Sequence, residues 1–197
     1  PILEPAFLYG GYPCRDLRHK FLLAQESQAE DLTEKVLPKG FEMIPLPGHF
    51  FDMVGFRTPD GAVYLADCLS SRETLDKYQI GFIYDVEAYI KTLEKVKTLT
   101  GKIFIPSHAA ASEEIAGLAQ YNIDKVYEIA EKILELCREP VCFEILLQRL
   151  FHEYSLNMNF EQYVLVGSTV RSYLSWLKDA GRAEAEFDHN MLLWKSV

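Results

Sequence analysis

The chain has 197 residues, of which 49% are apolar and 25% charged, a composition typical of a globular protein with one large or two small domains. Its formal net charge of −9 argues against a general binder of polyanions, because contacts to phosphate need lysine and arginine. No apolar run approaches the roughly 18 residues of a membrane span, so no membrane partner is expected. The four cysteines form no C-x-x-C pair, which favours reduced thiols in a cytoplasmic protein.

The first part of the chain is predicted to combine strands with one helix. Residues 1–30 contain several prolines and a Gly-Gly pair, so they are predicted to be an irregular lead-in. Strands are predicted at 41–46, 53–58, 62–66 and 102–105. The turn Pro59-Asp60-Gly61 joins two of them into a hairpin. Apolar residues at steps of three and four predict a helix over 85–99, capped by Asp85. A sheet with a helix on one face is an α/β layer.

The second part is predicted to be mostly helical. Helices are predicted at 115–137, 143–154 and 160–180, and strands at 183–187 and 191–195. Ser112 is the expected N-cap of the first helix, which is expected to bend near Tyr121-Asn122. Three helices followed by a β-hairpin are typical of a winged-helix domain, whose reading helix would lie near 168–178. The predicted domains are therefore 1–111 and 112–197.

Three side chains of metal-ligand type follow apolar runs. They are His49 after Leu46-Pro47-Gly48, Asp67 after a strand ending at Ala66, and His108 after a strand ending near Pro106. Side chains at three strand ends can converge on one edge of a sheet. Imidazole and carboxylate are the usual ligands of Zn²⁺, and imidazole also suits iron. The sequence therefore predicts a metal site at this edge, although each residue alone is more often an ordinary loop residue.

These motifs, in this order, resemble the second half of the metallo-β-lactamase fold. The resemblance covers about residues 40–110 and implies that His49 holds one metal ion, His108 the other, and Asp67 bridges them. The family's His-x-His-x-Asp-His stretch has no counterpart here. We therefore interpret residues 1–111 as the C-terminal part of a metallo-β-lactamase-like domain, half of an αββα sandwich. The alternative is a degenerate relative that has lost its metal.

The resemblance implies a metal-dependent hydrolase that acts on a small-molecule ester, thioester, amide or phosphoester. Two zinc ions are expected in the intact domain, with iron or manganese as alternatives, and no residue is assigned a purely catalytic role. This fragment alone is expected to be inactive. It is expected either to self-associate or to retain a missing N-terminal segment, because one apolar sheet face would otherwise be exposed.

The helical part also admits a non-catalytic role. Residues 124–197 contain 12 acidic and 8 basic residues, and the predicted hairpin carries Glu184, Glu186 and Asp188, which would repel phosphate. Sequence-specific DNA binding is therefore not expected, although winged helices often bind DNA. The alternative function for the whole chain is an interaction module, in which the winged helix makes protein or nucleic-acid contacts and the other half is only a scaffold.

Overall fold

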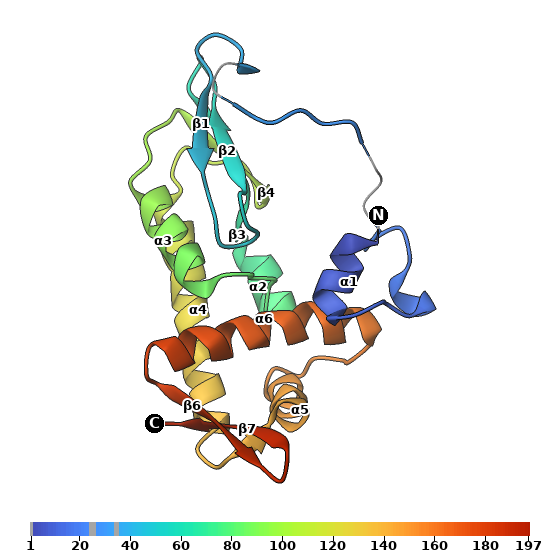
Figure 1. The fold of residues 1–197 in the computed structure, drawn as a ribbon. Helices are drawn as coiled ribbons and strands as arrows, with labels where there is room; N and C mark the ends of the chain where they lie inside the picture. The colour runs from blue at the N-terminus through green and yellow to red at the C-terminus, as the bar shows by residue number, and fades with distance from the viewer. Residues whose placement is uncertain (1, 24–26, 34–35) are drawn as a thin grey trace.

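The computed structural model describes residues 2–23, 27–33 and 36–197. Two sheets and six α-helices occur in these residues (Figure 1). In chain order the elements are α1 (Leu3–Tyr9), the 3-10 helix η1 (Arg15–Leu17), β1 (Glu42–Pro45), β2 (Val54–Arg57), β3 (Ala62–Ser70), α2 (Arg72–Tyr78), α3 (Val86–Lys97), β4 (Ile103–His108), α4 (Ala116–Leu136), β5 (Val141–Cys142), α5 (Phe143–Glu153), α6 (Phe160–Asp179), β6 (Ala183–Asp188) and β7 (Met191–Ser196).

The first sheet has the order β1-β2-β3-β4 and contains the four strands predicted from the sequence. β1, β2 and β3 are successive antiparallel strands, and the predicted turn between β2 and β3 is closed by the Thr58 N–H, which donates to the carbonyl of Ala62. β4 is parallel to β3, and the connection between them contains α2 and α3, because parallel neighbours need a long crossover. Consequently β1, β3 and β4 all run in the same direction and end at the same edge.

The sheet has one covered face and one open face. α3 and α4 lie along only one side of it among the described residues (Figure 1). Alternate side chains pack beneath these helices and are almost fully buried: Ile44, Val63, Leu65 and Phe104. Alternate side chains on the opposite face are aligned across the four strands: Met43, Phe56, Tyr64 and Ile105. Tyr64 is 46% exposed and the other three are partly buried, so this row of apolar residues is incompletely covered.

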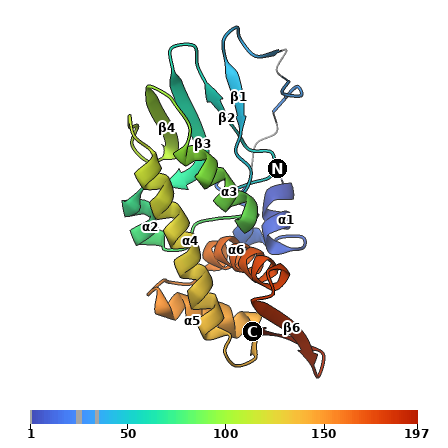
Figure 2. The same ribbon diagram turned by 90° about the vertical axis from the view of Figure 1, so that its left-hand side faces the viewer.

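Helix α4 joins the two halves of the molecule. It passes α3 at one end and α5 at the other (Figure 2). α4 continues without a break through Tyr121-Asn122, so the bend or break predicted there is absent, and the buried Asn122 amide bonds both main-chain groups of Ser70. The predicted Ser112 cap is also wrong. The Glu114 carboxylate accepts from the Ala116 and Gly117 N–H groups instead.

The C-terminal part has the order α4-β5-α5-α6-β6-β7, with a second sheet of order β5-β7-β6. Its three helices and its hairpin agree with the predicted elements, and short β5 is an additional strand. The hydrophobic core continues without interruption from β1 to β6, so the boundary predicted at 111/112 crosses a shared core. Thr169 of α6 accepts from the Ile83 N–H at 3.1 Å, and Ser172 donates to the Tyr84 carbonyl at 2.8 Å. Helix α6 therefore supports the loop that precedes α3.

Two helices were not predicted. α1 falls in the expected irregular lead-in. Pro5 lies in its first turn, where the missing N–H costs no helical hydrogen bond, and Gly10 ends it with φ +77°. α2 follows β3 directly and is capped by Ser71, whose hydroxyl accepts from the Thr74 N–H. No helix in the described parts of the chain is both long enough and apolar enough to cross a membrane.

Candidate metal centre

The three predicted ligands meet at the common edge of β1, β3 and β4. His49 Nε2 lies 3.9 Å from Asp67 Oδ2, and His108 Nε2 lies 3.4 Å from Asp67 Oδ1. The two imidazoles therefore face different oxygens of one carboxylate. Both distances exceed a typical hydrogen bond, so the three side chains are close neighbours without being bonded to one another. The predicted convergence of these residues is confirmed.

Gly48 allows the loop after β1 to reach this edge. It has φ +123°, and a Cβ atom at this position would collide with the main-chain N and Cα of Tyr89 at the start of α3. Its carbonyl accepts from the N–H groups of Tyr84 and Asp85. Thr92 of α3 donates to the Pro47 carbonyl at 2.6 Å. The loop is thus fixed to α3 by hydrogen bonds, and only glycine fits where the two main chains touch.

Asp67 reaches the site because β3 is irregular. The prediction that its strand ends at Ala66 is wrong, since β3 continues to Ser70. The strand instead shifts its register against β4 on both sides of Ala66, which has φ +48°. Such a bulge redirects the following side chain, and a non-glycine residue at positive φ carries local strain. The bulge accounts for the position of Asp67 at the surface, while the neighbouring Cys68 is fully buried.

His108 is the last residue of β4 and is paired with Ser70 of β3. Its carbonyl accepts from the Ser71 N–H at 2.9 Å. Asn122 of α4 accepts from the Ser70 N–H and donates to the Ser70 carbonyl, both at 2.9 Å. The end of β3 is therefore held from both sides, by β4 and by α4. This support extends to the segment that carries Asp67.

His49 is the most enclosed of the three ligands, with 24% of its side chain exposed, against 40% for Asp67 and 53% for His108. Burial lowers the pKa of His49 below 6.5, and this effect is opposed by the charge of Asp67 and by a hydrogen bond to the main chain of Phe82. Burial therefore favours the neutral imidazole. A neutral imidazole has the lone pair that a metal ion requires.

The chemistry of these donors suits zinc, but their number does not complete a site. Within residues 2–23, 27–33 and 36–197, no group of three or more His, Cys, Asp or Glu side chains is arranged to hold a metal ion. The two nitrogens approach a carboxylate from its two oxygens and do not surround one point. A structural zinc ion usually has four ligands, and a catalytic one usually has three from protein. Any ion held here would need further ligands from outside these three residues.

A large apolar cavity opens beside His49 and Asp67, and the sequence analysis missed it. Its volume is about 810 Å³, and α1, the 49–53 loop and the segment before α3 contribute its walls. The lining residues are Leu3, Glu4, Phe7, Leu8, His49, Phe50, Phe51, Met53, Asp67, Phe82 and Leu165. The Phe50-Phe51 pair directly after His49 was the available signal, because two adjacent phenylalanines in a loop must pack against something.

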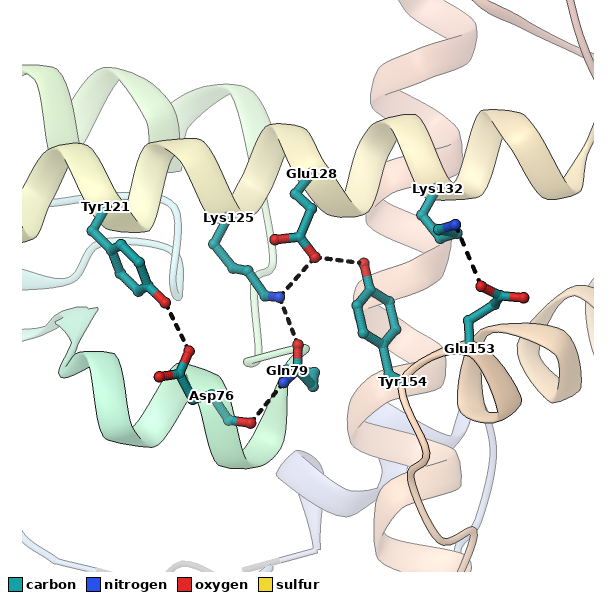
Figure 3. A network of polar contacts seen from close by, with 8 residues as sticks. All are labelled: Asp76, Gln79, Tyr121, Lys125, Glu128, Lys132, Glu153 and Tyr154. Atoms are coloured by element: carbon teal, nitrogen blue, oxygen red, sulfur yellow. Dashed lines mark hydrogen bonds and ion pairs between the residues drawn. The ribbon is translucent and has the colours of Figure 1, made fainter.

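A polar network between α4 and the ends of α2 and α5 was also not predicted (Figure 3). Lys125, with 11% of its side chain exposed, donates to Gln79 at 2.6 Å and to Glu128 at 2.8 Å. Tyr154 donates to the same Glu128 carboxylate at 3.2 Å. The network joins α2, α4 and α5. Its acids and bases pair with one another, so it is a structural connection between elements.

Comparison with known proteins identifies the fold. No family profile matches the sequence, and no curated protein matches it. A beta-lactamase domain protein from Burkholderia ambifaria aligns with a TM-score of 0.66 and 14% identity, over 89% of this chain and 55% of that protein. A metallo-beta-lactamase family protein from Thermus thermophilus aligns with a TM-score of 0.63 and 13% identity, over 80% of this chain and 49% of that protein.

The fold is therefore similar to that of metallo-β-lactamase family proteins, and the predicted mixed α/β fold is confirmed, while the half-sandwich and the winged helix stay predictions. The chain spans about half the length of the structures it matches.

Proposed function

We propose that this chain is part of a metal-dependent hydrolase, and that His49, Asp67 and His108 contribute to a site for two metal ions. The observation that carries the proposal is the pair of imidazole nitrogens facing the two oxygens of Asp67. A carboxylate with one histidine near each oxygen suits a bridge between two ions. Zinc fits nitrogen and oxygen donors, and iron and manganese are the alternatives.

Each group has a distinct role in this proposal. Burial favours the neutral form of His49 by lowering its pKa, and the neutral imidazole is the form that binds a metal ion. Asp67 supplies the negative charge that two neighbouring cations need. When bound, such ions make hydroxide available near neutral pH by lowering the pKa of water, which suits hydrolysis of an ester, thioester, amide or phosphoester bond.

We propose that the remaining ligands come from polypeptide that covers the open face of the β1–β4 sheet. The aligned apolar row on that face supports this, because alternate residues of the predicted 41–46, 53–56 and 63–65 segments lie uncovered there. The matched structures are also about twice as long as the aligned chain. The occupant is an N-terminal segment or, failing that, a second copy. Sedimentation of the 197-residue chain should therefore show self-association, and a stable monomer at high concentration contradicts the proposal.

We propose that α4–α6 with β5–β7 form a winged-helix unit that supports the site. The order of these elements and the hairpin β6–β7 are consistent with it. Thr169 and Ser172 of α6 bond the 83–84 main chain, so one face of the would-be reading helix is occupied by packing. Sequence-specific DNA is therefore not the proposed partner. The four free cysteines favour a cytoplasmic location.

Zinc titration tests the proposed function. Calorimetry should show stoichiometric binding to the longest product of the gene that encodes this chain. The isolated 197 residues should bind zinc weakly. Absence of metal from the longer protein would exclude the hydrolase and favour the alternative, a non-catalytic interaction module. Tight, stoichiometric zinc binding by the isolated chain would instead exclude the proposal that other polypeptide supplies the remaining ligands.

A further inference from the structure

The cavity beside His49 has an almost entirely apolar and aromatic wall. Phe50 and Phe51 stack with ring centroids 4.1 Å apart, and Phe7 of α1 meets both rings edge-on at 6.2 and 6.4 Å. Phe82 packs edge-on against the His49 imidazole at 5.4 Å. The cluster therefore extends without a break from α1 to a proposed metal ligand.

A ligand can reach the cavity wall, because its aromatic side chains are only partly buried. Phe7 is 46% exposed and Phe51 is 51% exposed. A volume of about 810 Å³ lies within the range of small-molecule sites, which are mostly apolar with a few polar groups. Here the polar groups are at one end, where His49 and Asp67 line the cavity.

The charges of the wall restrict the chemistry of the occupant. Glu4 and Asp67 line the cavity, and no lysine or arginine does so among the described residues. A phosphate or carboxylate tail in this cavity would face Glu4, and any charged group would be costly to bury against the apolar wall. The group that fills the apolar part of the cavity should therefore be uncharged.

We infer that the cavity binds an uncharged aromatic or acyl group of the substrate and presents the adjoining ester, thioester or amide bond to the His49–Asp67–His108 site. This inference rests on the proposed hydrolase and selects its substrate class. Phe51 and Phe7 are specificity-determining residues that contact the apolar group, and they take no part in the bond-breaking step.

The test uses the zinc-loaded product of the whole gene and p-nitrophenyl esters of increasing acyl length. kcat/KM should rise about threefold to fourfold for each added methylene, from acetate to hexanoate, because each buried methylene contributes about 0.8 kcal/mol. Phe51→Ser should flatten this dependence, and so should Phe7→Ser. Phe187→Ser is the matched control, since Phe187 is 78% exposed on β6 and lies outside the cavity.

A second readout does not need hydrolysis. Saturation-transfer NMR with 4-phenyl-2-butanone, an uncharged ketone that cannot be hydrolysed, should show binding to the wild type and to Phe187→Ser. Binding should be lost in Phe51→Ser, while the circular dichroism of all variants is unchanged. Ketone binding without ester hydrolysis would support the cavity and refute the hydrolase. Hydrolysis without dependence on acyl length, together with equal ketone binding by all variants, would overturn the inference and leave the hydrolase standing.

Discussion

The sheet β1–β4 differs from the helical unit α4–α6 with β5–β7 in the burial of its apolar residues and in where residues with positive φ lie. The helical unit buries the side chains between its helices, including Leu146, Leu150 and Tyr173, while Phe187 and Met191 of its hairpin are exposed, and its residues at positive φ lie in turns. The sheet leaves one face partly open and carries positive φ values at Gly48 and Ala66, beside the site. Backbone strain within the sheet thus occurs where the ligand-type residues converge, and the packed helical unit supports that edge.

The largest expected effect of a substitution is on activity and concerns the sheet. Asp67→Ala in the whole gene product should reduce ester hydrolysis by about a thousandfold or more, because two cations would lose their shared carboxylate. Folding should be retained, since the side chain is 40% exposed. Steady-state assays with circular dichroism check both expectations. Asp188→Ala on the far hairpin is the matched control, and full activity of the Asp67 variant would disprove the bridging role.

Substitutions at one glycine of the sheet half and one of the helical unit compare how strongly each backbone is constrained, through the free energy of unfolding. Gly48→Ala should lower the free energy of unfolding by about 3 kcal/mol or more, because its Cβ would collide with the Tyr89 main chain in a left-handed conformation. Gly181→Ala should cost only about 1 kcal/mol, because it also has positive φ but meets no atom within 4 Å. Urea denaturation of both variants measures the difference. Equal losses of unfolding free energy in the two variants would show that the close approach of Gly48 to α3 does not limit the side chain at position 48.

Two buried polar side chains provide the next test. Asn122→Leu should cost about 2 to 3 kcal/mol, because it leaves the Ser70 N–H and carbonyl without their partner. Tyr173→Phe should change stability by less than about 1 kcal/mol, since its hydroxyl has no hydrogen-bond partner among the described residues. Thermal and urea unfolding of the two variants decide this. A Tyr173→Phe loss as large as that of Asn122→Leu would contradict it.

The smallest effect concerns one buried cysteine in each half. Burial raises the pKa of Cys68 from 9.0 to about 12 and that of Cys137 to about 11. At about pH 8 both should resist a thiol reagent until the protein unfolds, whereas partly exposed Cys14 and Cys142 should react first. Rapid reaction of all four thiols in the folded protein would show that the reagent reaches Cys68 and Cys137 without unfolding.

The same pKa shifts predict how stability depends on alkaline pH. Because the folded-state pKa of Cys68 is raised, its contribution to stability is complete below pH 9 and is lost as pH rises from 9.0 to about 12. Cys68→Ser should reduce this dependence in that window, as followed by urea unfolding at several pH values. An unchanged dependence would mean that the thiol titrates equally in both states.

The local sequence was sufficient to predict most elements and the three ligand-type residues. Period-two and period-3.6 patterns depend on neighbours along the chain, so α3, α5, α6 and the hairpins could be located without tertiary information. Helices α1 and α2 were not predicted, because each is too short to show a repeating pattern of apolar residues. The bend predicted in α4 was wrong because the partner of Asn122 is Ser70, which is distant in sequence.

The sequence by itself identified His49, Asp67 and His108 as ligand-type residues that follow apolar segments of strand type. The parallel direction of β1, β3 and β4, which gives them a common edge, is a property of the tertiary structure. Only the tertiary structure decided that a bulge at Ala66 aims Asp67 between the two histidines. It also brought α1 against the 50–51 loop to form the apolar cavity. Both depend on contacts between distant segments, which no local pattern encodes.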